Sequence, residues 1–403
     1  MSRASHIVLR AVGGEVSAPG GVLSAPEARA EVDWQVETAS LSAKEVQDAQ
    51  RDPSLRVAPI MPVTLVAPVE LTEPVSAAPA PTSPPSAMSG ATWGVSAVGA
   101  VESPFTGAGV AVAVLDTGID AAHELFRGKD IVQKDFTGEG DGDGHGHGTH
   151  CAGTLFGGSL DGVRIGVAPG VSRAFIGKVL SGSGSGGTDQ MLDGLLWAVR
   201  SGANIVSMSL GFDFPGMVRD LVASGMEIEP ATSQALTAFR ENVRLFDAVG
   251  QLVRAHSAMF GNAIVIAAAG NESKRPRYQV ATAAPAASDG LISVGALQQV
   301  SGQATQLAVA PFSNAGPIVA APGVAIQSAK VGGGLRALNG TSMATPHVAG
   351  VAALWLEQIK SRSPSAGVRQ LEGRLLGTAS LDSMAPGEDL SNVGVGLVRA
   401  PLR

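Results

Sequence analysis

The chain has 403 residues, of which 45% are hydrophobic and 16% are charged, so it can bury a large core and is not expected to be disordered along most of its length. Its formal net charge is −7, so it has no excess of basic residues with which to bind a phosphate backbone. We therefore expect no nucleic-acid partner. A single cysteine, Cys151, excludes an intrachain disulfide and leaves the redox compartment open.

The amino-terminal residues carry little apolar character. The longest apolar run there is Ile7 to Leu9, which is too short for the core of a signal peptide. No apolar stretch of the sequence reaches the length of a membrane span, so we expect no membrane partner. On these grounds the sequence favours a cytoplasmic protein over a secreted one.

Residues 1–66 are predicted to form a small α+β unit. A short strand is expected over residues 6–12. Ser42 and Glu45 form a capping-box pattern that opens a helix. Residues 56–66 are rich in β-branched side chains and predict an extended run.

From about residue 91, apolar runs alternate with helical patterns. The apolar runs have the character of strands buried on both faces and cover residues 110–115, 174–180, 205–210, 263–268 and 291–296. Between them, apolar residues recur at helical spacing, as from Met191 to Val199. This alternation predicts an α/β fold, with a mostly parallel central sheet and helices on both faces.

Four polar residues fall where a predicted strand ends or a predicted helix begins. Asp116 follows a strand in Val-Leu-Asp-Thr-Gly, and His147 stands where a glycine-rich loop meets a helix, in His-Gly-Thr-His-Cys-Ala-Gly. Asn271 follows a strand in Ala-Gly-Asn-Glu, and Ser342 opens a long helix in Gly-Thr-Ser-Met-Ala-Thr-Pro. Because active groups gather at such junctions in α/β sheets, we expect the four to converge.

These residue types match the needs of nucleophilic catalysis. A serine hydroxyl is a weak nucleophile, so a histidine must take its proton. A buried aspartate must hold the imidazole in the right tautomer and stabilise its charged form. Donors must meet the oxyanion, and the Asn271 amide and the backbone N–H of Ser342 can do so. The sequence thus predicts a catalytic triad of Asp116, His147 and Ser342 with Asn271 as oxyanion donor.

In this order, the four segments resemble the subtilisin-like serine protease family, over about residues 91–403. The cysteine four residues after His147 resembles that of the thiol-containing branch near proteinase K. The resemblance implies a serine endopeptidase that acts on polypeptides through an acyl-enzyme and needs no cofactor for its chemistry. The alternative is a catalytically silent peptide-binding protein with the same fold.

By the same resemblance, further positions would bind the substrate. One wall of the primary specificity pocket would be formed by Ser209, Leu210 and Gly211. The facing wall would be formed by Ala268, Ala269 and Gly270. The edge against which an extended substrate pairs would include Gly182, Ser183 and Gly184.

The first unit resembles the inhibitory propeptide of this family, which implies that the chain's own N-terminal segment acts as an intramolecular inhibitor and chaperone. The alternative is a generic accessory domain. Residues 13–31 depart from that pattern, because they are poor in helix formers where the propeptide usually has its first helix. Residues 67–90 are rich in proline and alanine and are expected to form an exposed linker that is the place of self-cleavage. An insertion around residues 212–233 is interpreted either as a flap over the substrate cleft or as a surface elaboration.

The sequence offers candidate residues for two kinds of metal site. His145, His147 and His150 resemble a zinc hydrolase pattern, but that pattern needs an acid at position 149, where the chain has Thr149, so we name no metal ligands. The family often uses structural calcium, for which the acidic candidates are Asp135, Asp141, Asp143 and Asp161. Calcium takes many backbone carbonyls that a sequence does not reveal, so its ligands stay unassigned.

Overall fold

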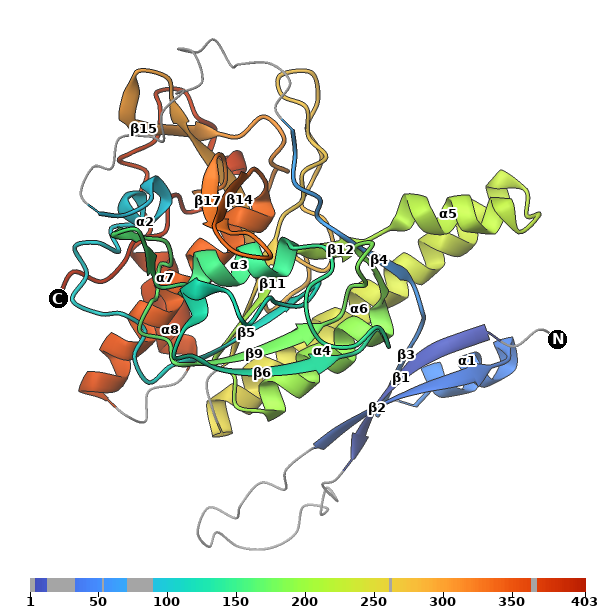
Figure 1. Ribbon diagram of the computed structural model, residues 1–403. Helices are drawn as coiled ribbons and strands as arrows, with labels where there is room; N and C mark the ends of the chain where they lie inside the picture. Colours follow the sequence, from blue (N-terminus) through green and yellow to red (C-terminus); the bar gives the residue numbers. More distant parts are fainter. Residues whose placement is uncertain (1–3, 13–32, 53, 71–89, 261–262, 364–367) are drawn as a thin grey trace, which may run out of the picture. The chain divides into compact units, whose positions relative to one another are not determined.

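The structure is a computed structural model that describes residues 4–12, 33–52, 54–70, 90–260, 263–363 and 368–403 (Figure 1). It confirms the predicted fold class: a mixed α/β structure with a largely parallel central sheet and a small N-terminal β unit. The chain divides into two compact units, Met1–Met61 with Phe214–Leu245 and Pro62–Asp213 with Phe246–Arg403. The expectations for residues 13–31 and for most of the linker, residues 71–89, lie outside the described residues.

The first unit contains a three-stranded antiparallel sheet in the order β2-β1-β3. Its strands are β1 (Ala4–Val12), β2 (Asp33–Leu41) and β3 (Leu55–Pro59). Ile7 and Leu9 of the middle strand are fully buried. Helix α1 (Ala43–Gln50) begins at the predicted capping box, in which Ser42 accepts the Glu45 N–H and the Glu45 carboxylate accepts the Ser42 N–H at 2.7 Å.

Residues 214–233 of the insertion belong to the same unit. They form α5 (Phe214–Ala223) and the first part of α6 (Ile228–Phe260). The rings of Phe214 and Phe239 pack edge to face with centroids 6.1 Å apart, so α5 folds back along α6. The insertion is therefore a pair of helices that contact each other within the first unit.

The second unit is built on an eight-stranded sheet in the order β15-β14-β13-β11-β5-β9-β6, with β16 also paired to β14. Its neighbours are parallel except for the antiparallel pair β14 and β15. The strands are β5 (Ala111–Asp116), β6 (Asp130–Asp135), β9 (Arg173–Lys178), β11 (Ile205–Met208), β13 (Ile264–Ala268), β14 (Leu291–Val300), β15 (Gln303–Val309) and β16 (Val319–Pro322).

Smaller elements surround this sheet. A separate three-stranded sheet has the order β10 (Ser185–Gly187), β4 (Pro62–Leu65) and β12 (Leu210–Phe212). Two hairpins pair β7 (Ser159–Leu160) with β8 (Val163–Arg164) and β17 (Ile326–Ala329) with β18 (Leu335–Leu338). The helices are α2 (Trp93–Ala97), α3 (His147–Phe156), α4 (Thr188–Arg200), α7 (Thr341–Arg362) and α8 (Val368–Gly377), with short 3-10 turns at Glu124–Phe126 and Leu390–Asn392.

Helices cover both faces of the central sheet (Figure 1). Val112 and Val114 of β5 belong to a core that also includes residues of α3 and α7. Strand side chains alternate between faces, and Phe175 of β9 packs on the other face against Trp197 of α4, with ring centroids 5.9 Å apart. The carboxyl ends of the parallel strands meet at one edge of the sheet, and that edge holds the candidate site.

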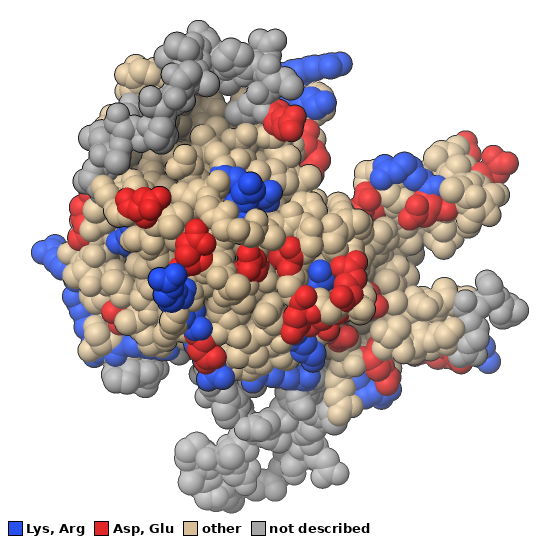
Figure 2. Space-filling view, viewed as in Figure 1, with Lys and Arg blue, Asp and Glu red and all other residues tan. Residues whose placement is uncertain are grey.

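On the face visible in Figure 2 most of the surface is uncharged, and both acidic and basic side chains occur on it. Among the described residues, no helix combines the length and the apolar character needed to cross a membrane.

Candidate active site

Asp116 and His147 form a buried pair at the carboxyl edge of the sheet. Asp116 is the last residue of β5 and His147 is the first of α3, and both side chains are fully buried. The His147 Nδ1–H donates to the Asp116 carboxylate, at 2.8 Å from Oδ1 and 3.0 Å from Oδ2. A carboxylate in this position selects the tautomer in which Nε2 can take a proton.

The Asp116 charge also sets the protonation of His147. Burial lowers the pKa of His147, whereas the nearby Asp116 carboxylate raises it by its charge and its hydrogen bond. Cys151 adds to the effect of Asp116, and together they outweigh burial, so the pKa of His147 lies well above the ordinary value of 6.5. The pair therefore favours the imidazolium, which is the state that a general base reaches after taking a proton.

A second carboxylate, that of Asp143, holds the start of α3. Only 9% of Asp143 is exposed. Its oxygens accept five hydrogen bonds, from the hydroxyls of Thr117 and Thr149 and the backbone N–H groups of His145, Gly146 and Thr149. Negative charge is favourable at a helix N-terminus, so Asp143 positions the turn that carries His147. Sequence reasoning named Asp143 only as a calcium candidate, although an acid just before a helix start was the available signal.

Ser342 and Asn271 lie on neighbouring segments of the same edge. Ser342 is the second residue of α7 and is fully buried. The Asn271 Oδ1 accepts the backbone N–H of Thr341 at 2.8 Å and its hydroxyl at 2.9 Å. With Oδ1 held in this way, Nδ2 is the free end of the amide, and it donates to the carbonyl oxygen of Ala67 at 2.8 Å.

His147 and Ser342 both contact Cys151. The Cys151 Sγ lies 3.7 Å from His147 Nδ1 and 3.4 Å from the carbonyl oxygen of Ser342. Burial raises the pKa of the Cys151 thiol, so it stays protonated and packs as a small apolar group. His147 Nε2 has no hydrogen-bond partner in the described parts of the chain, and the Ser342 hydroxyl donates instead to the carbonyl oxygen of Val66 at 2.8 Å.

The strand β4 lies in this site as an extended peptide. It pairs antiparallel with β10 on one side and with β12 on the other. The Val66 N–H donates to the carbonyl oxygen of Ser209 at 3.2 Å. Further along, the Val69 N–H donates to the Asn339 carbonyl at 2.9 Å and the Asn339 amide donates to the Val69 carbonyl at 2.8 Å. The backbone of this segment is thus hydrogen-bonded both before and after the point at which it passes Ser342.

The residues predicted to bind substrate differ in their contact with β4. Leu210 and Gly211 are in β12 beside it, Ser209 binds Val66, and the Gly184 carbonyl accepts the Leu65 N–H at 2.8 Å. Gly182 and Ser183 lie in the turn before β10, where their hydrogen bonds go to Glu139 and to Ser181 and Ser185. Ala268, Ala269 and Gly270 are buried at the end of β13, where the Gly270 N–H donates to the Thr341 hydroxyl at 3.2 Å.

The three histidines of the zinc-like pattern do not share one centre. The His150 Nε2 bonds the carbonyl oxygen of Ile326 at 2.9 Å, and burial lowers the pKa of His150 to about 3. His347 behaves similarly: it bonds the Met343 carbonyl at 2.8 Å, and burial lowers its pKa to about 4. In the part of the chain that the structure describes, the one trio spaced to hold a metal ion is Asp116, His147 and Cys151, which belongs to the site above.

A model of the subtilase family matches residues 107–396, which include all four of the converging residues. The chain belongs to the subtilase family. Alkaline elastase YaB of Bacillus sp. (strain YaB) is 37% identical over 300 residues, which are 72% of this subtilase and 65% of the elastase. Subtilisin DY of Bacillus licheniformis is 35% identical over 299 residues, 72% of this chain and 91% of its own length. Subtilisin E of Bacillus subtilis (strain 168) is 33% identical over 296 residues, 72% of this chain and 66% of its own length.

The family and these relatives support a subtilisin-like serine endopeptidase, a hydrolase that acts on peptide bonds. They correct the expectation of a cytoplasmic location, which is wrong: the subtilisins that resemble this subtilase are secreted bacterial proteins. That expectation rested on the short apolar run near the amino terminus, which is weak ground for a location.

Proposed function

We propose that this subtilase hydrolyses internal peptide bonds through an acyl-enzyme, with Ser342 as nucleophile, His147 as general base and then acid, and Asp116 as the residue that orients His147. The observation that carries the proposal is the bound peptide: the Ser342 hydroxyl lies 2.8 Å from the carbonyl oxygen of Val66 in an extended strand. A nucleophile beside a backbone carbonyl, with a buried Asp–His pair on the next element, suits attack on a peptide bond.

In the proposed reaction, Ser342 Oγ attacks the carbonyl carbon while its proton passes to His147 Nε2. The oxyanion is then held by Asn271 Nδ2 and by the backbone N–H of Ser342 at the start of α7. The imidazolium returns the proton to the leaving amine. Water, deprotonated by His147 in turn, hydrolyses the acyl-enzyme and frees Ser342.

The hydroxyl of Ser342 has a single proton, so it cannot donate to Val66 and to His147 at once. In the arrangement seen here it donates to Val66, and His147 Nε2 is left without a partner among the described residues. We infer that the attack begins when the carbonyl oxygen turns toward Asn271, because this frees the hydroxyl for His147.

The N-terminal segment is proposed to act as an intramolecular inhibitor of the same site. Residues 62–66 follow directly on the first unit and bind both edges of the cleft, so a substrate would have to displace them. Because the strand is tethered, its effective concentration at the site is high even if its intrinsic affinity is modest.

A fluorophosphonate probe tests the catalytic assignment. It should label Ser342 in the wild-type chain and in Ser361→Ala, a control on the same helix whose hydroxyl bonds only the Gln358 carbonyl among the described residues. Ser342→Ala should be unlabelled and should hydrolyse no peptide. A wild-type chain that folds but is neither labelled nor active would support the silent peptide-binding protein instead.

A further inference from the structure

We propose that Arg336 is a positioning residue for the reaction: its guanidinium holds the backbone carbonyl of Gly146 and thereby fixes the place of the His147 ring. The proposal rests on the proposed function, because it takes His147 to be the general base. It goes beyond that function by naming a cation outside the triad on which turnover depends.

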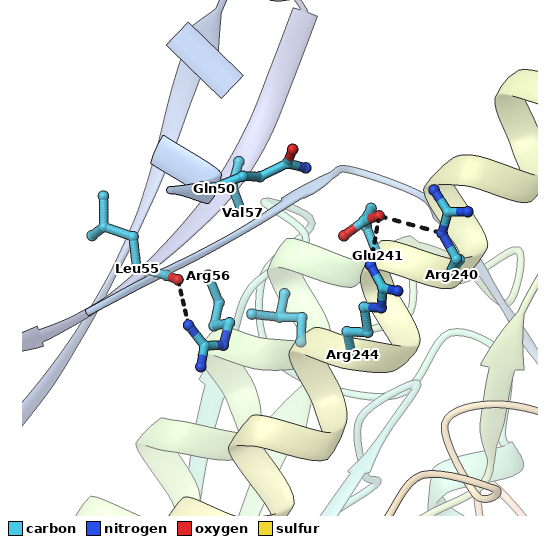
Figure 3. A pocket seen from close by; sticks show the side chains of 8 residues that line it. Gln50, Leu55, Arg56, Val57, Arg240, Glu241 and Arg244 are labelled. Carbon is cyan, nitrogen blue, oxygen red and sulfur yellow. Dashed lines mark hydrogen bonds and ion pairs between the residues drawn. The ribbon is translucent and has the colours of Figure 1, made fainter. Parts of the chain in front are cut away.

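The arginines of the first unit show how an ordinary surface arginine is held (Figure 3). The side chains of Arg240 and Arg244, which line a pocket there, are 59% and 64% exposed. Both pair with the Glu241 carboxylate of the same helix, at 3.4 Å and 3.3 Å. Exposed pairs of this kind contribute little to stability. Arg336 differs from them in its burial and in its partner.

Arg336 lies on β18, is half-buried, and reaches a backbone group instead of a carboxylate. Its Nη2 donates to the carbonyl oxygen of Gly146 at 2.7 Å. Its Nε is buried and has no hydrogen-bond partner among the described residues. Since a buried donor without a partner is unfavourable, hydrogen bonding alone does not explain why the guanidinium lies here.

The cation is also unfavourable for the helix that it touches. Gly146 is the N-cap of α3, and a helix N-terminus carries a partial positive charge. A guanidinium there lowers helix stability, whereas the Asp143 carboxylate raises it. The first hydrogen bond of the helix, from the His150 N–H to the Gly146 carbonyl, is long at 3.4 Å, and the guanidinium shares that acceptor. Helix stability therefore does not account for Arg336 either.

Two opposite charges hold the backbone of Gly146. Asp143 Oδ1 accepts the Gly146 N–H at 2.6 Å, and Arg336 donates to the Gly146 carbonyl. Gly146 has a φ of 88°, in the left-handed region that glycine adopts without strain, so its backbone is not fixed by its own conformational preference. A Cβ at this position would lie 3.2 Å from Arg336 Nη2, so the close approach of the guanidinium also favours glycine. The two charges thus set the direction in which the chain enters His147.

The ring of His147 depends on its backbone for its aim. Its Nδ1 donates to Asp116, but its Nε2 has no hydrogen-bond partner in the described parts of the chain. A ring that is anchored at one edge can turn about that bond, so the position of its Cα decides where Nε2 points. A catalytic group has to be held within about 0.5 Å of its working geometry by the residues that support it. Gly146 directly precedes His147, so a shift of its carbonyl moves the base.

The hairpin that carries Arg336 is itself attached to α3. Ser328, which lies opposite Arg336 in the hairpin, donates through its hydroxyl to the His150 carbonyl at 2.8 Å. The His150 Nε2 lies 2.9 Å from the carbonyl oxygen of Ile326 and 3.2 Å from that of Arg336. These contacts use the backbone of Arg336 and not its side chain. Loss of the guanidinium should therefore leave the hairpin in place.

Steady-state kinetics of Arg336→Met on a peptide substrate test the proposal. Methionine keeps an unbranched side chain but has neither the charge nor the donors. We expect kcat to fall by about tenfold to a hundredfold, because a small displacement of the base slows proton transfer steeply. KM should stay within about twofold, since no hydrogen bond joins Arg336 to the described residues 62–70. Arg336→Lys keeps the charge but loses the planar guanidinium, and its kcat should lie about threefold below that of the wild type.

Lys330→Met is the matched control, because it removes a cation from the same hairpin. The Lys330 side chain is exposed, and its Nζ makes no hydrogen bond or ion pair in the portions of the chain that the structure covers. This variant should have the kcat and KM of the wild type. A fall in its kcat equal to that of Arg336→Met would mean that any positive charge on the hairpin suffices, and would overturn the specific role of Arg336.

A double variant tests whether Asp143 and Arg336 act through the same residue. If both fix Gly146, the combination of Asp143→Asn with Arg336→Met should lower kcat by clearly less than the product of the two single losses. Losses that multiply fully would show that the two charges act independently, which would contradict the shared role of Gly146.

The possible failures can be told apart. Wild-type kcat in a folded Arg336→Met, or a rise in KM at constant kcat, overturns the role of Arg336 and leaves the proposed function intact; thermal melts report the fold. If Arg336→Met does not fold, Arg336→Lys decides, and wild-type kcat in that variant overturns the proposal. A wild-type chain that the fluorophosphonate probe does not label and that cuts no peptide overturns the proposed function itself.

Discussion

The hydroxyl of Ser342 donates a hydrogen bond of 2.8 Å to the carbonyl oxygen of Val66, a residue 276 positions earlier in the chain. Under the proposed function, the chain therefore holds a piece of itself where a substrate would lie. The backbone pairing of β4 with β10 and β12 explains how this strand is bound without special side chains, since main-chain hydrogen bonds supply most of the contact. The side chains of Val63, Leu65 and Val66 are buried as well.

Replacing Asn271 by alanine should lower kcat strongly and change KM little. The Asn271 amide is aimed at the bound peptide by two hydrogen bonds from Thr341 to its Oδ1. Loss of one oxyanion donor costs about 3 kcal/mol of transition-state stabilisation, or roughly a hundredfold in kcat. This magnitude comes from a subtilisin, which is a relative of this chain. Steady-state kinetics on a peptide substrate check this, with a thermal melt to confirm the fold. A rise in KM at constant kcat would contradict the assigned role.

The pH dependence of activity should show an acidic limb well above pH 6.5, because the Asp116 carboxylate raises the pKa of His147 and only the neutral imidazole can take a proton. For stability the sign is opposite: the charged pair stabilises the fold below pH 6.5, and this contribution is lost as the pH rises through the raised pKa.

Asp116→Asn provides the matching variant for the pH profile. Without the carboxylate charge, burial dominates and the acidic limb of kcat/KM should move to lower pH, while kcat falls by about 10⁴-fold because the imidazole loses its orienting partner. Kinetics over a pH series measure both effects. An unmoved limb would mean that another group titrates.

Asp143→Asn should weaken the turn that carries His147. The pKa of Asp143 is lowered, because burial alone would raise it but the hydrogen bonds from Thr149, Gly146 and Thr117 outweigh burial. Its contribution to stability is therefore present above pH 3.8 and is lost as the pH falls through the lowered pKa. The variant should lose about 1–3 kcal/mol of unfolding free energy at neutral pH.

Urea unfolding at several pH values measures this loss, and Asp141→Asn, an exposed position two residues earlier, is the control. The difference from wild type should shrink in acid. If Asp141→Asn and Asp143→Asn were equally stable at neutral pH, Asp143 would have no special part in holding α3.

Cys151→Ala should keep most of the activity and lose roughly 1 kcal/mol of stability, because burial raises the pKa of the thiol and leaves it protonated beside His147. Activity and melting temperature of the variant check this. A loss of turnover comparable to that of Ser342→Ala would instead assign the thiol a chemical role.

Local patterns in the sequence predicted much of the fold. The capping box at Ser42 begins α1, and the apolar run over residues 110–115 becomes β5. Both could be predicted because helix caps and buried strands depend on residues that are close together in the sequence. The extended run predicted over residues 56–66 is instead two strands, β3 and β4, which pair in different sheets. Its β-branched composition suits any strand and does not say which partner each half takes.

The insertion also shows that local sequence patterns do not identify long-range contacts. The sequence interpretation of residues 212–233 named no helices, whereas α5 and the first part of α6 form there, and the contact between Asn242 and Pro59 joins residues far apart in the chain. No periodicity encodes such a contact. The interpretation of the insertion as a flap over the cleft stays a prediction.

By itself, the sequence determined the family, the α/β fold and the four residues expected to carry the chemistry, because a nucleophile, a base, an orienting acid and an amide donor each sit in a recognisable short motif. Only the tertiary structure decided which carbonyl faces Ser342, that Asp143 braces the helix of His147, and that the insertion packs with the N-terminal sheet. Those relationships depend on strand register and on long-range packing. The free energy that selects a register or a packing arrangement is a sum over contacts in the whole fold, so it cannot be deduced from residues that are adjacent in sequence.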